Sequence, residues 1–238
     1  MNAASSILPT TMAPSSILPA CLLRPALESR WLDHILRRRA ADILRLSALS
    51  DWLPNRGLLL DLGAGSGHVA EAVQRAAPGR HCVMIDPVHA PARHLARRLA
   101  RRGRAGLTGL LGDGTRLPFP PALFEGAWAS FVLHHVPPPE QERMLDEIAR
   151  VLRPGAPFVL LEDTPASARE AAVTLRADRR LNAERQAAPH HYRAPEAWPA
   201  LLARHGLVVR EQIGFSGIFP RASLRAVRHT AYLAHRTV

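Results

Sequence analysis

Short apolar runs alternate with amphipathic stretches through most of the chain. The runs predict buried strands, and the stretches, whose apolar residues recur every three or four positions, predict helices. The expected strands are residues 58–62, 82–85, 107–111, 126–132, 158–161, 207–213 and 227–238. Strands separated by helices indicate an α/β fold whose sheet of about seven strands is mostly parallel, with helices on both faces. We expect the last strand to lie antiparallel at the sheet edge.

Two helices are predicted ahead of this core. Apolar residues recur at helical spacing over residues 25–52, and Pro54 ends the pattern. We expect residues 22–56 to form an N-terminal helical lid. Residues 1–21 repeat the sequence Ser-Ser-Ile-Leu-Pro and are rich in proline, which predicts a disordered leader. Met12 lies within this leader, so the sequence leaves open whether translation starts there or at Met1.

The core is expected to span residues 57–238 and to carry a helical insertion at about 164–205. Within that insertion, helical patterns cover residues 166–185 and 195–205. Such helices would flank the carboxyl ends of the strands, where ligands bind in parallel α/β sheets.

Composition and charge narrow the function classes. Hydrophobic residues make up 47% of the 238 positions, and no apolar run approaches the roughly 18 residues of a membrane span. The net charge of +11 is of the kind that attracts nucleic acid. However, all 31 basic residues are arginine, and their runs lie on segments with helical periodicity. We therefore favour solvated helix faces over a nucleic-acid footprint.

Cysteine usage indicates a reducing compartment. Cys21 and Cys82 have no metal-ligand spacing and form no disulfide framework, so a cytoplasmic location is expected. The sequence before Cys21 faintly resembles a lipoprotein processing site. No basic residue precedes Arg24 and prolines interrupt the apolar stretch, so we expect no export.

The strongest motif is a strand that runs directly into glycines and then into a helix. Asp61 lies near the end of this strand, and Gly63, Ala64, Gly65 and Gly67 follow it. Glycines suit a tight turn that a ligand approaches closely, and amides at the start of the next helix face that ligand. The same stretch fits the dinucleotide-binding pattern G-x-G-x-x-A, so a nicotinamide enzyme remains an alternative.

Asp86 and Pro87 end the second strand, where a carboxylate can bind both hydroxyls of a ribose, and this spacing suits either cofactor. Two later segments distinguish the alternatives. The segment Leu-Gly-Asp-Gly-Thr at 111–115 and the turn Leu-Arg-Pro-Gly at 152–155 come next in order. With these motifs, residues 57–163 resemble the class I S-adenosylmethionine-dependent methyltransferases of the small-molecule, type 11-like kind.

The resemblance implies a Rossmann-like fold that binds S-adenosylmethionine and transfers a methyl group to a small, partly apolar metabolite by in-line displacement. The cofactor-binding residues it implies are Asp61, Gly63, Ala64, Gly65, Gly67, Asp86, Pro87, Asp113, Gly114 and Ser130. Asp113 matches the family's adenine-contacting acid, although a turn former beside two glycines is the alternative. Glu125 stands where the family usually has Asp, at a position not expected to touch the cofactor.

Candidate catalytic residues lie after the fourth strand. In the family this loop lies beside the methyl group, which here indicates His134 and His135. His134 is the preferred general base because imidazole titrates near neutrality, and a base is needed only if the acceptor carries a proton. The alternative is that both histidines pack at a strand end. Glu162, Asp163 and residues 190–192 could face the same pocket. No metal is expected, because no carboxylate or cysteine spacing accompanies the histidine pairs.

Three rival functions remain: a nucleic-acid methyltransferase, a non-catalytic protein that retains the fold, and a nicotinamide oxidoreductase. Against the first, enzymes that methylate bases often carry an acidic or amide residue followed by Pro-Pro after the fourth strand, and this chain has no such motif there. Against the second, a non-catalytic protein would be expected to have a damaged glycine loop, and all the glycines and acids are present here. The third leaves Asp113 unexplained. The sequence leaves open whether oxygen, nitrogen, carbon or sulfur is methylated, and it does not indicate the oligomeric state.

Overall fold

The computed structural model describes residues 26–87, 106–181, 190–218 and 227–238. The expected leader at 1–21 lies outside them. Two units are distinguished, Met1–His34 and Ile35–Val238. In the first unit, the described residues are the beginning of helix α1 (Ala26–Ser47), and all the other described elements belong to the second unit.

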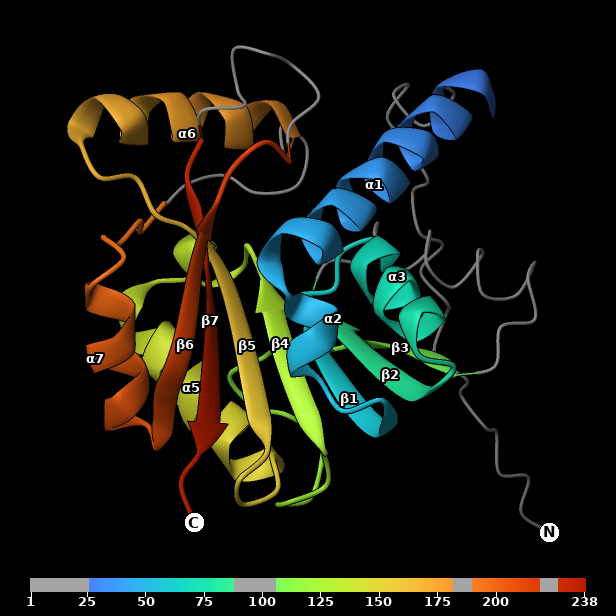
Figure 1. The fold of residues 1–238 in the computed structure, drawn as a ribbon, viewed down its shortest axis with the longest axis vertical. Coiled ribbons are helices and arrows are strands. Elements are labelled where there is room, and N and C mark those ends of the chain that lie inside the picture. The colour runs from blue at the N-terminus through green and yellow to red at the C-terminus, as the bar shows by residue number, and fades with distance from the viewer. Residues whose placement is uncertain (1–25, 88–105, 182–189, 219–226) are drawn as a thin grey trace, which may run out of the picture. The chain divides into compact units, whose positions relative to one another are not determined.

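The second unit is built on one seven-stranded sheet in the order β3-β2-β1-β4-β5-β7-β6 (Figure 1). The strands are β1 (Arg56–Leu62), β2 (Gly79–Asp86), β3 (Leu107–Leu111), β4 (Gly126–Ser130), β5 (Pro157–Asp163), β6 (Leu207–Phe215) and β7 (His229–Arg236). Strands β1 to β5 pair in parallel, and β7 pairs antiparallel with both β5 and β6. The mostly parallel α/β fold expected from the sequence is confirmed.

The position expected for the last strand is wrong. Strand β7 is antiparallel, but it lies between β5 and β6, and β6 forms the edge. Residues 229–234 of β7 are all buried, whereas every residue of β6 after Leu207 is half-buried or exposed. A strand that is buried along most of its length, as β7 is, suits an interior position in the sheet better than an edge.

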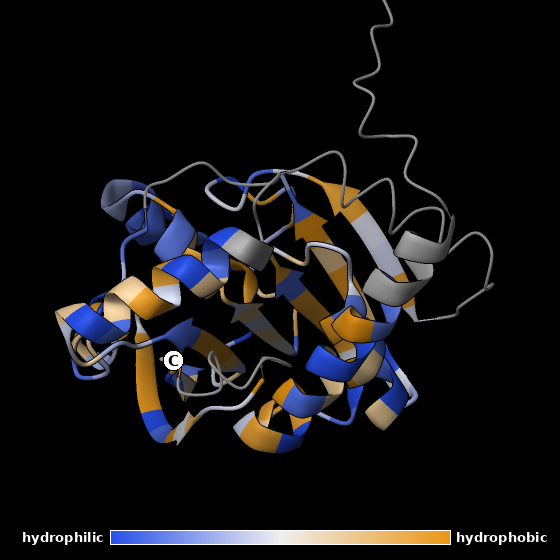
Figure 2. Ribbon diagram, turned by 90° about the horizontal axis from the view of Figure 1, so that it is seen from above, coloured by the Kyte–Doolittle hydropathy of each residue, from blue (hydrophilic) through white to orange (hydrophobic). Residues whose placement is uncertain are grey.

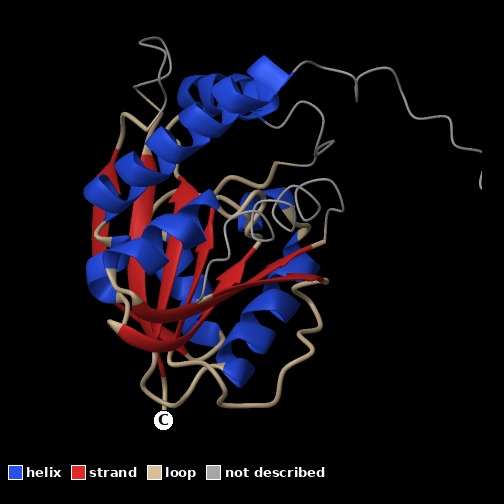
Figure 3. Cartoon of the chain, turned by 90° about the vertical axis from the view of Figure 1, so that its right-hand side faces the viewer, coloured by secondary structure: helices blue, strands red, loops and turns tan. Residues whose placement is uncertain are grey.

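Helices cover both faces of the sheet. They are α2 (Leu49–Trp52), α3 (His68–Ala76), α5 (Pro138–Val151), α6 (Ala168–Leu181) and α7 (Ala197–Arg204), beside the C-terminal part of α1. A short 3-10 helix, η2 (Leu133–His135), comes after β4. Figure 1 shows α2 and α3 in front of the sheet and α5 behind it, and Figure 3 shows the twist of the strands. The helices predicted at 195–205 and 166–185 appear as α7 and α6, with 182–185 outside the described residues.

Each face of the sheet carries its own hydrophobic core. Met144, Leu145 and Ile148 of α5 pack with Trp198 and Leu201 of α7 on one face. The other core contains residues of α1, α2, α3 and α6, among them Ile43, Leu49, Val73 and Ala177. Figure 2 shows orange and blue residues side by side on the coloured helices that surround the sheet. The helices are thus held by amphipathic packing against the sheet.

Within the described ranges, no helix has the length and apolar character that crossing a membrane requires. The cytoplasmic location stays a prediction.

Candidate active site

The glycine loop turns back onto the end of β2. The amides of Gly63 and Ala64 both donate to the carbonyl oxygen of Ile85, at 2.8 and 3.2 Å. Gly63 has φ +71°, and a Cβ there would lie 2.4 Å from Cγ2 of Val132, so no side chain fits. Gly65 has φ +53°, yet a Cβ would meet nothing within 4 Å. The loop is therefore packed tightly at Gly63 and leaves room for a ligand at Gly65.

Two acids meet at this loop. The Gly65 amide donates to Oδ2 of Asp86 at 2.8 Å, which ties the loop to the end of β2. Asp61 is only 2% exposed, and its Oδ2 has no hydrogen-bond partner among the described residues. Burial, followed by the charge of Asp86, raises the pKa of Asp61 well above its ordinary value. A buried acceptor without a donor fits a ligand that brings one.

These residues lie where the strand order changes direction. Strand β1 pairs with β2 on one side and β4 on the other, so Gly63, Asp86 and Ser130 follow or end adjacent strands at their carboxyl ends. Ligands in open α/β sheets bind at such a switch point. Ser130 has a buried hydroxyl with no hydrogen-bond partner in the described chain. Pro87 is exposed, directly before residues 88–105, which lie outside the described ranges.

Asp113 has the contacts of a turn former. Its Oδ1 accepts the Thr115 amide at 2.8 Å, and its Oδ2 accepts the Thr115 hydroxyl at 2.9 Å. Gly114 is buried, and a Cβ there would lie 2.9 Å from Met144 and 3.0 Å from Leu62. Asp113 itself is exposed, and a carboxylate can accept further hydrogen bonds. Its role at the cofactor stays a prediction.

Histidines fill the segment after β4. His134 is completely buried, and its Nδ1 lies 2.6 Å from Oε2 of Glu162. Burial would lower the pKa of His134, but the charge and hydrogen bond of Glu162 outweigh it and raise that pKa to about 9. The other oxygen of Glu162 accepts the amides of Val132 and Leu133 at 3.2 and 2.7 Å. Glu162 therefore fixes both the loop and the imidazole.

The structure joins these histidines to residues that are distant in the sequence. Oδ2 of Asp178, on α6, lies 3.6 Å from Nε2 of His135 and 3.0 Å from Nδ1 of His190. The sequence predicts His190 near the pocket, whereas it gives no direct indication of Asp178. The sequence shows no carboxylate at ligand spacing from the histidines, and the fold brings Asp178 to them from α6. A signal was available, since Asp178 shares the buried face of α6 with Thr174 and Ala177.

Asp163, the second acid at the end of β5, has a different partner. Its Oδ1 lies 2.7 Å from Nδ1 of His229 on β7, and both side chains are buried. Burial would raise the pKa of Asp163, but the hydrogen bond and charge of His229 lower it. This pair fastens β7 to β5 beside the site.

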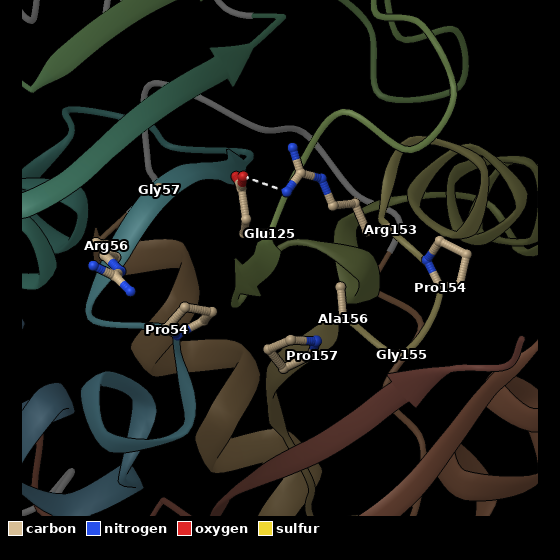
Figure 4. A pocket seen from close by; sticks show the side chains of 9 residues that line it. All are labelled: Pro54, Arg56, Gly57, Glu125, Arg153, Pro154, Gly155, Ala156 and Pro157. Carbon is tan, nitrogen blue, oxygen red and sulfur yellow. Dashed lines mark ion pairs between the residues drawn. The ribbon is translucent and has the colours of Figure 1, made fainter.

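A shallow pocket of about 660 Å³ lies at the opposite end of the sheet. Its lining includes Arg56, Gly57, Glu125, Arg153 and Pro157, at or near the amino ends of β1, β4 and β5 (Figure 4). Glu125 pairs with Arg153 at 2.7 Å and accepts the Leu58 amide at 2.7 Å. Because ligands bind at the carboxyl ends in this topology, we do not assign the pocket to the active site. Glu125 thus lies away from the cofactor-site residues, as expected.

Comparison with known proteins agrees with this arrangement. Residues 59–155 match the family described as "Methyltransferase domain". The chain is 34% identical to demethylmenaquinone methyltransferase of Thermus thermophilus, over 63% of this chain and 64% of the relative. It is 29% identical to 27-O-demethylrifamycin SV methyltransferase of Amycolatopsis mediterranei, over 55% and 48%. The chain thus spans about half to two thirds of the length of these two curated relatives.

Solved structures show the same fold. A SAM-dependent methyltransferase from Methanosarcina mazei superposes with a TM-score of 0.65 at 18% identity, covering 80% of this chain and 97% of that protein. The matched family region contains the glycine loop, both strand-end acids and the β4 loop. Residues 59–155 thus match a methyltransferase domain, and the described chain has the fold of a SAM-dependent methyltransferase.

Proposed function

We propose that this chain transfers a methyl group from S-adenosylmethionine to a small, partly apolar metabolite by in-line displacement. The observation that carries the proposal is the 2.8 Å contact between the Gly65 amide and Asp86, beside buried Asp61. Both acids lie at the carboxyl edge where the strand order changes direction. The orphaned Oδ2 of Asp61 and the open space at Gly65 fit a bound donor molecule.

S-adenosylmethionine, when bound, supplies a methyl group activated on a sulfonium. In this proposal Asp86 accepts hydrogen bonds from the ribose hydroxyls while it keeps the Gly65 amide, since a carboxylate has about four acceptor sites. Asp61 accepts a hydrogen bond from the donor molecule, and Ser130 and Asp113 border the site. Orientation of donor and acceptor supplies much of the rate, so a base is needed only for a protonated acceptor. His134 and His135 stay predictions as catalytic residues.

The acceptor class rests on the named activities of the relatives. One is named for demethylmenaquinone and the other for 27-O-demethylrifamycin SV. We therefore take quinone-type and other partly apolar ring compounds as the acceptors to test first. A nucleic-acid acceptor and a non-catalytic role are the alternatives that the same experiments address.

Calorimetric titration with S-adenosylmethionine, S-adenosylhomocysteine and NAD tests the donor side. We expect micromolar binding of the two sulfur compounds. Asp86→Ala should weaken it by about 10- to 100-fold, because hydrogen bonds to a charged group contribute about 1.5–3 kcal/mol. Asp146→Ala is the matched control, since Asp146 is exposed and pairs with His205 on the surface.

Preferential binding of NAD, or no binding of the sulfur compounds, would overturn the donor assignment. Equal losses in Asp86→Ala and Asp146→Ala would overturn the role of Asp86. Once binding is established, mass spectrometry of acceptor mixtures should detect the gain of one methyl group. Methylation of RNA alone would contradict the proposed acceptor class.

A further inference from the structure

Four potential ligands converge beside the β4 loop, outside the residues assigned to the methyl donor. They are His134 and His135 of η2, Asp178 of α6 and His190, which begins a later described segment. One nitrogen or oxygen atom from each lies within 4.8 Å of all the others. Three separate segments thus direct donor atoms to one small volume.

The separations suit a metal ion. Zinc bonds to nitrogen and oxygen are about 2.0–2.1 Å long, so tetrahedral ligand atoms lie about 3.3–3.4 Å apart. Oδ2 of Asp178 lies 3.0 Å from Nδ1 of His190 and 3.6 Å from Nε2 of His135, which brackets that value. Modest side-chain rotations would close the wider separations in the group.

Hydrogen bonding in the cluster is incomplete without a further ligand. Nε2 of His134 is buried and has no hydrogen-bond partner among the described residues. Nδ1 of His190 is also buried, and it lies close to Asp178 without the alignment of a hydrogen bond. Buried polar atoms in native proteins are normally satisfied, so two such nitrogens in one cluster fit a ligand that the chain itself does not supply.

A supporting carboxylate is already in place. Nδ1 of His134 lies 2.6 Å from Glu162, which leaves Nε2 as the nitrogen available to a metal. Metal-binding histidines usually donate their second nitrogen to a carboxylate, which fixes the ring orientation. Glu162 is completely buried and is also held by the amides of Val132 and Leu133. The ring of His134 is thus oriented in advance.

The geometry points to a site for a divalent transition-metal ion, such as Zn²⁺, formed by His134, His135, Asp178 and His190. Three imidazoles and one carboxylate suit zinc, iron, cobalt or nickel better than magnesium or calcium, which prefer oxygen ligands. The metal-free alternative is a buried cluster in which Asp178 pairs with the histidines. Metal binding here does not depend on the proposed methyl transfer.

The test is calorimetric titration of tag-free, chelator-treated full chain with ZnCl₂, together with visible absorption after addition of CoCl₂. We expect one ion per chain at micromolar affinity or tighter, and cobalt absorption bands of a four-coordinate site. His135→Ala and Asp178→Ala should each weaken zinc binding by at least about 100-fold, and Glu162→Gln by about 10- to 100-fold. Far-UV circular dichroism would check that the variants remain folded.

His205→Ala is the matched control. His205 also pairs with an aspartate, Asp146, at 2.7 Å, but lies outside the cluster, so zinc affinity should be unchanged. X-ray absorption at the zinc edge of the wild-type protein needs no variant and should count three imidazole ligands. Weak binding of several ions, fewer than three imidazoles, or equal effects of His135→Ala and His205→Ala would overturn the site.

Discussion

The ionised carboxyl of Asp61 destabilises the folded protein when no ligand is bound. Its carboxyl is buried and one oxygen lacks a hydrogen-bond donor among the described residues. Burial and Asp86 raise its pKa, so folding disfavours the charged form. At pH 8 we expect Asp61→Asn to raise the free energy of unfolding by about 1 kcal/mol, or Tm by about 2–4 °C, in a thermal melt without cofactor.

The pH dependence of this effect has a definite sign. An unfolded Asp ionises near pH 4, while folded Asp61 ionises at higher pH, so stability is lost as pH rises through this interval. The advantage of Asp61→Asn should therefore vanish as the pH approaches 4. Asp42→Asn, which changes a half-exposed acid on α1, should show no gain at either pH. A less stable Asp61→Asn protein at pH 8 would mean that the carboxylate is stabilised rather than strained.

At the scale of elements, one buried arginine joins several of them. Arg80, on β2, is 1% exposed and donates to the carbonyl oxygens of Ser50, Leu53, Pro54 and Val73 at 2.6–3.0 Å. These carbonyls belong to α2, the link to β1, and α3. Arg80→Met would leave buried acceptors unpaired, so we expect a loss of about 3 kcal/mol and a fall in Tm of about 6–12 °C.

Arg204→Met is the control for this substitution. Arg204 pairs with Glu142 at 3.0 Å, but both side chains are at least half exposed, and such pairs contribute little. We expect its chemical denaturation midpoint to stay close to that of the wild type. Equal stability of Arg80→Met and Arg204→Met would show that the carbonyls are satisfied without Arg80.

The elements were predictable from sequence to different degrees. Apolar runs and helical periodicity identified the strands and helices because burial imposes those periods locally. The insertion of β7 between β5 and β6 was not predicted, since pairing depends on distant segments rather than on the pattern within one strand. Arg80 was equally invisible, because nothing local distinguishes it from the other 30 arginines.

In the candidate site, too, some residues were predictable from the local sequence and others were not. The glycine loop and Asp86 were found because turn geometry and ligand binding require those residues in a fixed local order. Asp178 was missed because it reaches His135 and His190 only through the packing of α6. The orphaned oxygen of Asp61 and the buried pair of His134 and Glu162 likewise require coordinates.

At the scale of the whole molecule, the positive charge is large but is carried by many separate elements. The 31 arginines exceed the 20 acidic residues by 11. Ion pairs occur on several elements, including Arg37 with Glu71, Arg150 with Glu147 and Arg228 with Glu170. A dispersed charge attracts polyanions without reading their sequence.

We therefore expect weak binding of short single-stranded RNA and DNA, measured by fluorescence anisotropy with labelled oligonucleotides. Affinity should be independent of base sequence and should fall by at least about tenfold between about 50 and 200 mM salt, because it arises from counterion release. The affinity for S-adenosylmethionine should not change when RNA is present. Sequence preference, or binding that persists at the higher salt concentration, would instead indicate contacts to bases, which dispersed arginines do not provide. That result would favour a nucleic-acid acceptor over a small metabolite, since salt-resistant recognition requires a dedicated surface.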